Sequence, residues 1–225
     1  MKKKVVAGLL MSASVLGVVV SGGVSSYAAE TEVGIGFSSH TDPGESGDLR
    51  IRWVPTELDF GTNNVVNKTT SVEFAELDEV VGGKKYTVVE DKRDHTGEDV
   101  EWKLTAAVSD LVSSTSATTK LTGAVLKFDT DKHGYSDDQG LASEGIVTAT
   151  PQHTASMEAN YTIDANSSSA ATKVMTDGDT DNNVTSFEGN TAMEMKNIKL
   201  SVPGNVAQKG HQYKGKMTWT LSDSI

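Results

Sequence analysis

Strict alternation of apolar and polar residues constrains this chain more than any other feature of its sequence. Successive side chains of a β-strand point to opposite faces, so this pattern is typical of strands with one buried face. In five runs the large apolar residues stand two positions apart, and three shorter runs are further strand candidates. The five runs are residues 49–53, 100–106, 157–164, 198–202 and 213–221, and the shorter ones are 86–89, 123–128 and 146–149.

The stretches between these runs are rich in turn-forming residues, mainly Gly, Asp, Asn and Ser, and the chain shows no long helical period. Many short strands separated by such turns predict an all-β fold: a two-sheet sandwich of short antiparallel strands, with long polar loops. A Ser/Thr-rich stretch is open to two interpretations, an exposed crossing or a capped turn. The predicted loops are 41–48, 82–83, 91–99, 129–140, 166–171 and 177–183, and the Ser/Thr-rich stretch is 113–119.

The N-terminal segment 1–29 has the layout of a secretory signal peptide. Three lysines at residues 2–4 precede an apolar run over residues 5–20, and small residues then offer a cleavage bond after Ala28 or Ala29. The alternative is a retained membrane anchor, but the apolar run is short for a membrane span. We therefore expect a secreted protein.

The remainder, residues 30–225, is long enough to bury a core as one domain without disulfide staples. The chain contains no cysteine, so its stability must come from packing alone. No second apolar stretch of spanning length follows the predicted signal peptide, so we expect no direct insertion into a membrane.

Charge narrows the classes of partner. The formal net charge is −11, and loss of the three lysines in the predicted signal peptide would take it to −14. Such an acidic surface disfavours binding to nucleic acid and to anionic lipid. Binding to an anionic wall polymer would therefore have to rely on local contacts or on bridging cations.

Two Trp-x-Leu triplets, at Trp102–Leu104 and Trp219–Leu221, carry a resemblance to a known family. In this order, and with the segments that precede them, they are similar to the WxL domain of Gram-positive surface proteins such as those of enterococci, listeriae and lactobacilli. The resemblance runs from about residue 51 to residue 225. The preceding segments are Val54-Pro55, Leu58, Phe60-Gly61 and the run Tyr-Thr-Val-Val-Glu-Asp-Lys-Arg over residues 86–93.

The resemblance implies a short, single-domain member whose whole mature part, residues 30–225, is the cell-wall-binding domain. It implies non-covalent attachment to peptidoglycan at the cell surface, in a complex with a membrane-anchored WxL-interacting protein. The alternative that the family suggests is an adhesin that binds host extracellular matrix proteins.

The triplets themselves are open to two interpretations. At period two, Trp102 and Leu104 share one sheet face, as do Trp219 and Leu221, so both pairs are candidates for the core. In the functional interpretation these four residues are the peptidoglycan-binding site, with aromatic faces that stack on sugar rings. The second triplet is the stronger candidate, because its strand also presents polar side chains such as Lys214 and Lys216 on the opposite face.

Two acidic clusters are candidates for metal binding, although we expect no metal and no cofactor. Residues 177–188 place carboxylates at positions 1, 3, 5 and 12 of a loop, which is the ligand spacing of a calcium loop. Asn182 stands at position 6, where such loops need glycine, so an exposed acidic loop is the preferred interpretation. Asp129, Asp131 and His133 form a weaker cluster.

No motif indicates catalysis. The sequence has no cysteine nucleophile, no Gly-x-Ser-x-Gly elbow and no His-Glu-x-x-His helix, and none of its five histidines stands four residues from another. Two carboxylates suffice to cleave a glycan, but no pair stands out among 31 acidic residues. We therefore expect a binding protein and no enzyme.

Overall fold

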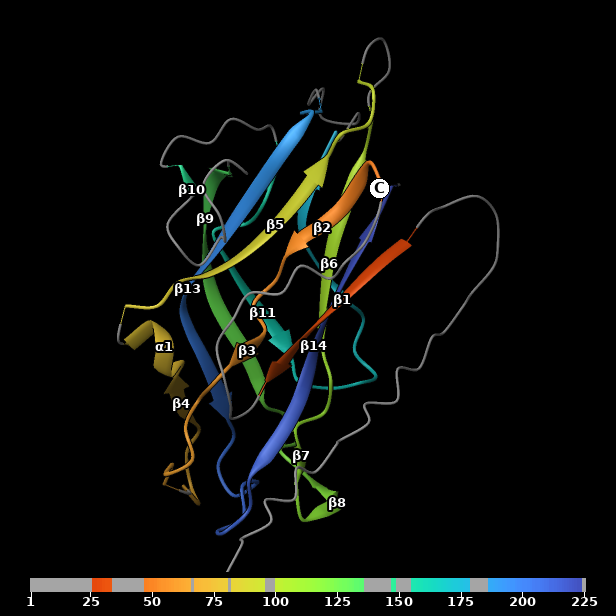
Figure 1. Ribbon diagram of the computed structural model, residues 1–225. Coiled ribbons are helices and arrows are strands. Elements are labelled where there is room, and N and C mark those ends of the chain that lie inside the picture. Colours follow the sequence, from red (N-terminus) through yellow and green to blue (C-terminus); the bar gives the residue numbers. More distant parts are fainter. Residues whose placement is uncertain are drawn as a thin grey trace, which may run out of the picture.

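The computed structural model describes residues 26–33, 47–65, 67–80, 82–95, 100–135, 147–148, 155–178 and 186–223. Two β-sheets, almost entirely antiparallel, pack face to face over a common core (Figure 1), and each has seven strands among these residues. The predicted all-β two-sheet sandwich is confirmed. None of the helices in these described ranges is long and apolar enough to cross a membrane.

The first sheet is built around β6 (Trp102–Val108) and β14 (Tyr213–Ser222), which are neighbours. Its order is β12-β6-β14-β1-β3, and a small hairpin of β7 and β8 pairs with the start of β14. The other strands are β1 (Ser26–Val33), β3 (Glu57–Leu58), β7 (Val112–Ser113), β8 (Ser116–Lys120) and β12 (Thr172–Asp177).

The second sheet is built around two long neighbours, β9 (Val125–Tyr135) and β13 (Gly189–Val202). Its order is β10-β9-β13-β5-β2, with β11 also on β9 and β4 also on β13. A short helix, α1, connects β4 to the turn before β5. The bounds are β2 (Leu49–Trp53), β4 (Val72–Ala75), α1 (Leu77–Val80), β5 (Lys85–Asp91), β10 (Val147–Thr148) and β11 (Asn160–Asp164).

A bulge in β13 lets that one strand serve two partners. The register of β13 against β9 shifts between Lys196 and Lys199, where Asn197 has a φ of 51°, and the strand then leaves β5 and pairs with β4. Both carboxylate oxygens of Glu79 in α1 accept hydrogen bonds from the bulge, one from the backbone N–H of Asn197 and one, at 2.7 Å, from that of Ile198. The helix therefore satisfies the donors that the bulge takes out of the ladder.

The alternating runs predict most of the core correctly. Burial alternates strictly along β2, β6 and the second half of β14. Ala159, which is exposed, and Trp53 depart from the predicted faces. The register of β2 against β5 shifts between Ile51 and Trp53, so Trp53 lies opposite Val88 and donates its indole N–H to the hydroxyl of Tyr135 at 2.7 Å. A β-bulge reverses the face of every later residue, so Trp53 belongs to a separate small cluster.

Two polar stretches that were expected outside the strands are largely strand. Residues 129–135 belong to β9, because β13 pairs with them and supplies the backbone hydrogen bonds that a polar strand needs. The Ser/Thr-rich stretch 113–119 is neither a crossing nor a capped turn, since most of it forms the β7–β8 hairpin. The predicted loop 166–171 lies outside the strands, and residues 136–140 lie outside the described part of the chain.

The predicted signal peptide lies mostly outside the described residues, which begin at Ser26. β1 pairs antiparallel with β14, and in this register Ala29 lies opposite Trp219. Cleavage after Ala28 or Ala29 would leave the strand from residue 29 or 30 to Val33. The signal peptide and its cleavage bond stay predictions.

Candidate functional site

The two Trp-x-Leu triplets lie side by side in the first sheet. The antiparallel register of β6 and β14 places Leu104 opposite Leu221 and Trp219 opposite Ala106. Trp102 is 1% exposed, and the side chains of Leu104, Trp219 and Leu221 are completely buried. The triplets are therefore one cluster of side chains facing the second sheet, although more than 110 residues separate them in the sequence.

This burial favours the core interpretation of the triplets. A sugar ring stacks only on an aromatic face that solvent can reach, and neither tryptophan offers one. The four residues predicted to bind peptidoglycan thus have no surface with which to do so in the folded domain. The lysines on the opposite face of β14 are exposed, as the alternation requires.

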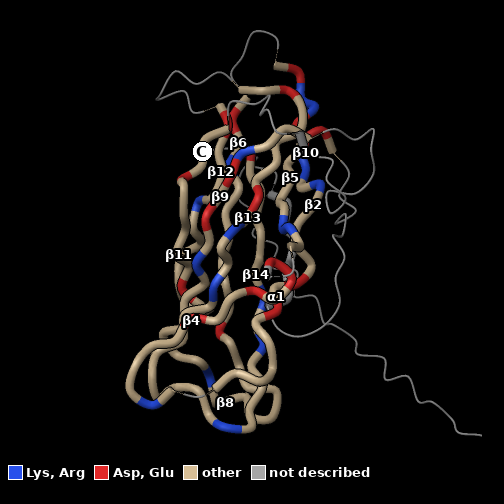
Figure 2. Tube along the Cα trace, turned by 90° about the vertical axis from the view of Figure 1, so that its left-hand side faces the viewer, with Lys and Arg blue, Asp and Glu red and all other residues tan. Residues whose placement is uncertain are grey.

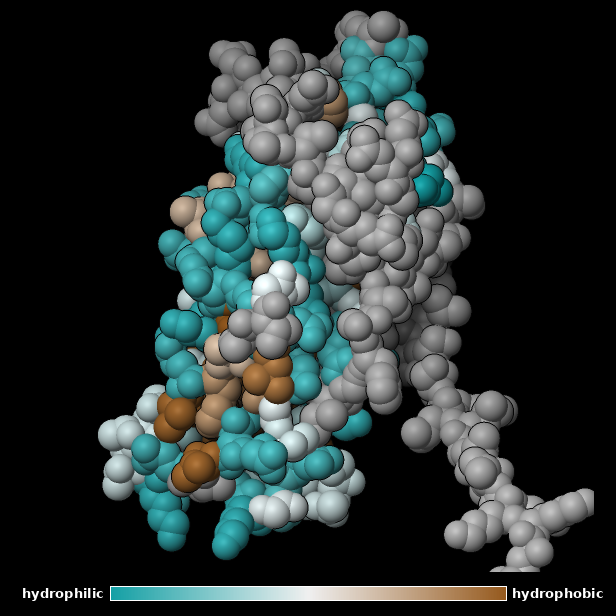
Figure 3. Space-filling view, turned by 60° about the vertical axis from the view of Figure 1, so that its left-hand side comes forward, coloured by the Kyte–Doolittle hydropathy of each residue, from teal (hydrophilic) through white to brown (hydrophobic). Residues whose placement is uncertain are grey.

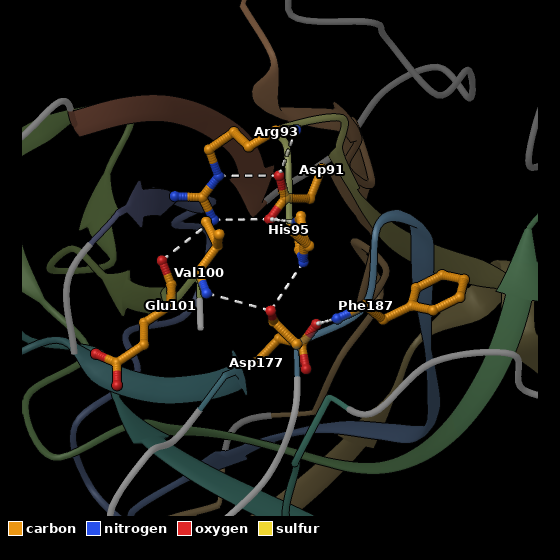
Figure 4. A network of polar contacts seen from close by, with 8 residues as sticks. Asp91, Arg93, His95, Val100, Glu101, Asp177 and Phe187 are labelled. Atoms are coloured by element: carbon orange, nitrogen blue, oxygen red, sulfur yellow. Dashed lines mark hydrogen bonds and ion pairs between the residues drawn. The ribbon is translucent and has the colours of Figure 1, made fainter. Parts of the chain in front are cut away.

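A polar latch at one end of the sandwich secures the first triplet (Figure 4). Asp91, the last residue of β5, is buried and accepts two hydrogen bonds from the guanidinium of Arg93, at 2.9 and 2.7 Å. Arg93 also donates to the carbonyl of Glu101 at 3.2 Å, just before Trp102. Because β5 and β6 belong to different sheets, the hydrogen bond from Arg93 to Glu101 joins the two layers, and the bidentate pair with Asp91 orients the Arg93 guanidinium for it.

Further contacts of the latch come from the end of β12 and from the residues just before β13. The hydroxyl of Ser186 accepts a hydrogen bond from the backbone N–H of Val100 at 3.2 Å and pairs with Nδ1 of His95 at 2.8 Å. Asp177 ends β12 opposite Trp102, and its carboxylate accepts the backbone N–H of Phe187 at 2.9 Å. Within the segment at residues 86–93, Asp91 and Arg93 thus have a structural role in the latch.

Glu90, beside the latch, is held by two cations. Burial alone would raise the pKa of its carboxyl, but hydrogen bonds from Lys92 and Arg50 outweigh burial and keep the pKa below its ordinary value. Glu90 is therefore charged at neutral pH and stabilises the fold. Because its pKa is lowered on folding, this contribution is present at neutral pH and is lost as the pH falls through the folded-state pKa.

A large cleft lies at the opposite end of the sandwich, and we call it the end cleft. Its volume is about 980 Å³, and it opens between the loop after β3, β4, the β7–β8 region and the loop before β14. Hydrophobic surface gathers near this end of the face shown in Figure 3. Val65, which lines the cleft, is 82% exposed. The residues that line it include Asp59, Phe60, Asn64, Lys68, Phe74, Leu111, Leu121, Leu200, Val202, Asn205, Gln208, Lys209, His211, Gln212 and Tyr213.

The loop before β14 is fastened to its surroundings at two points. The rings of His211 and Tyr213 are stacked, with centroids 6.2 Å apart, and Nδ1 of His211 pairs with the hydroxyl of Ser113 at 2.7 Å. The hydroxyl of Tyr213 accepts a hydrogen bond from the backbone N–H of Gln208 at 2.9 Å. The aromatic wall of the end cleft is therefore held in place before any ligand arrives.

The sequence prediction missed the end cleft. Its walls come from segments that are far apart in the chain, so no single motif marks it. One signal was available: residues 208–213 read Gln-Lys-Gly-His-Gln-Tyr, an amide- and aromatic-rich stretch without an acid in a strongly acidic chain.

The predicted calcium loop is only partly within the described residues, which leave out 179–185. Its first residue, Asp177, was expected to be exposed, and that is wrong: it is 1% exposed and its carboxylate serves the latch. Glu188, at the last position, is exposed.

Of the three residues in the second predicted cluster, Asp129, Asp131 and His133, two lie in a group that could hold a metal ion. Asp131, His133 and Glu194 offer ligand atoms within 4.8 Å of one another on neighbouring strands, whereas the third predicted residue, Asp129, accepts a hydrogen bond from Asn197. Both carboxylates of the trio already have cations: Lys196 pairs with Asp131, and Lys84 lies 3.5 Å from Glu194. A metal ion would have to displace these ammonium groups, so this cluster is a weak candidate.

The fold and its end cleft define a β-sandwich binding domain, with a packed tryptophan core and a preformed surface cleft. A family model described as "WxL domain surface cell wall-binding" matches residues 36–224 of the chain. The chain belongs to this family, and the resemblance seen in the triplets is confirmed. It is thus a surface protein that associates with the cell wall. No curated protein and no solved structure matches the chain significantly.

Proposed function

We propose that this protein attaches non-covalently to peptidoglycan after export, as part of a surface complex with a membrane-anchored WxL-interacting protein. Membership of a cell-wall-binding family carries the proposal, because the matched region spans nearly the whole chain. The end cleft supports it with an accessible surface suited to a polar polymer, whereas the buried triplets offer none.

The purified domain should sediment with isolated peptidoglycan sacculi and release no soluble fragments from them. Binding without release is expected because we propose a binding protein and no hydrolase. The measurement is a pelleting assay, with the supernatant examined for reducing sugars and free muropeptides. Fragments that accumulate with time would contradict the non-enzymatic part of the proposal, and a protein that stays in solution would contradict wall binding.

Retention at the surface should depend on a second contact, made with the membrane-anchored partner. Two weak contacts, one with the wall and one with a tethered protein, combine through effective concentration into firm retention. Affinity purification from solubilised cell envelopes should therefore recover a WxL-interacting protein that carries a transmembrane helix. Purification after muramidase digestion is the control, because a partner that disappears together with the wall fragments was bound to the wall and not to this domain.

A further inference from the structure

We infer that the end cleft is the site that contacts the cell wall, and that it binds a short segment of N-acetylated glycan carrying a carboxylate. The inference rests on the proposed peptidoglycan binding and adds the site and the ligand chemistry. Peptidoglycan fits this description, since its N-acetylated sugars carry lactyl and peptide carboxylates. Neither the triplets nor the latch offers a comparable accessible surface.

Size and shape favour an extended ligand. A volume of about 980 Å³ is at the upper end of the range for small-molecule sites, so it suits a few sugar units. Buried aliphatic side chains of Leu111, Leu121, Leu200 and Val202 form its floor. Phe74 and Tyr213 also line the cleft, and because they are only half-buried they offer the partly accessible aromatic surface that the core tryptophans lack.

The rim of the cleft suits an N-acetylated sugar. Four exposed amide side chains, those of Asn64, Asn205, Gln208 and Gln212, stand around the opening. Each side-chain amide can both donate and accept a hydrogen bond, as hydroxyl and acetamido groups require. Asn64 already donates to the carbonyl of Phe60 at 2.7 Å, which fixes its orientation.

Charge selects for an acidic ligand. In an acidic chain, the three segments at this end, residues 59–70, 109–124 and 203–214, carry four lysines and only two aspartates. Figure 2 shows blue segments on the loops at this end, whereas red segments accompany the blue ones along the strands. Lys68 and Lys209 are exposed and line the end cleft itself, together with one carboxylate, that of Asp59. A carboxylate at the mouth would therefore meet cations in an otherwise repulsive surface.

Rigidity strengthens this site. The contacts of His211 with Ser113, and of Tyr213 with Gln208, hold the aromatic wall without a ligand. A preformed site loses less conformational entropy on binding, so modest contacts yield measurable affinity.

The test compares two double variants. The cleft variant combines Lys68→Glu and Lys209→Glu, and the control variant combines Lys132→Glu and Lys173→Glu, which lie outside the end cleft. All four lysines are exposed, and both variants change the net charge equally, so both should fold. Titration with a soluble disaccharide-peptide muropeptide should show a roughly tenfold weaker affinity for the cleft variant and little change for the control, because each reversal turns an attraction into a repulsion.

Two further measurements test the need for a carboxylate and the location of the site. Chitotetraose has the N-acetylated sugars without a carboxylate, so it should bind wild type more weakly than the muropeptide and should not distinguish the two variants. Amide shift changes on muropeptide binding should fall on the loops that hold Gly61 and Gly210.

Several results would overturn the inference. Equal muropeptide affinity of both variants, or shift changes away from the end cleft, would place the wall contact elsewhere while sedimentation of wild type with sacculi upheld the proposed function. Preference for a glycerol-phosphate polymer over the muropeptide would assign the cleft to another wall component. Failure of wild type to sediment or to bind muropeptide would reject the proposed function and the inference together.

Discussion

Replacement of Trp219 by alanine is expected to lower the free energy of unfolding by about 3–5 kcal/mol. The indole is completely buried between the two sheets, next to the other triplet, so its loss removes apolar burial and leaves a large cavity. The stability of a typical domain is only about 5–15 kcal/mol, so the variant should be near the limit of folding. Urea denaturation followed by tryptophan fluorescence and far-UV circular dichroism measures the change.

Lys214→Ala is the matched control for this substitution. Lys214 belongs to the same strand but is exposed, so its replacement should change stability by less than about 0.5 kcal/mol. If Trp219→Ala instead left the unfolding transition unchanged and abolished sedimentation with sacculi, Trp219 would be a wall-contact residue. The packing described for β14 would then be wrong.

Replacement of Asp91 by alanine should destabilise the domain by about 3–5 kcal/mol, because it leaves the Arg93 guanidinium without its buried partner. The Asp91 side chain is 2% exposed, and its two oxygens accept a bidentate pair of hydrogen bonds from Arg93, which in turn donates to the carbonyl of Glu101 just before β6. Thermal unfolding measured by differential scanning calorimetry gives the effect. The loss should be largely local to this end, so hydrogen exchange should accelerate first around residues 100–102.

Glu73→Ala tests whether burial is the reason for the large stability loss expected of Asp91→Ala. Glu73 pairs with Lys127 at 2.8 Å, but both side chains are about 42% exposed, and pairs of this kind contribute little because water and salt screen them. The variant should lose less than about 1 kcal/mol. Equal losses from Asp91→Ala and Glu73→Ala would contradict the role assigned to the latch.

The two predictions separate stability from binding. The triplets and the latch hold the sheets together away from the end cleft, which lies at the opposite end of the sandwich from the latch. We therefore expect variants of Lys68 and Lys209 to fold normally. Loss of wall binding in a triplet variant should follow from unfolding, and its extent should match the unfolded fraction.

The sequence alone determined the class of fold and the family. Alternation at period two predicts strands because the pleat of a strand dictates it locally, and the pair of triplets in this order predicts WxL membership. Residues in unbroken alternation, such as those of β6, were correctly predicted to share a buried face. The polar residues 129–135 were missed as a strand because β13, which is distant in sequence, supplies their backbone partners.

The tertiary structure decided which faces are buried and where a ligand can reach. Alternation at period two predicts that Trp219 and Leu221 point to the same face of their sheet. That face is buried only because the second sheet packs against it. A one-residue bulge moved Trp53 to the other face, and nothing local in the sequence announces it. The end cleft could not be predicted either, because a concave surface formed by four separate loops and strands exists only once the long-range strand pairs have brought them together.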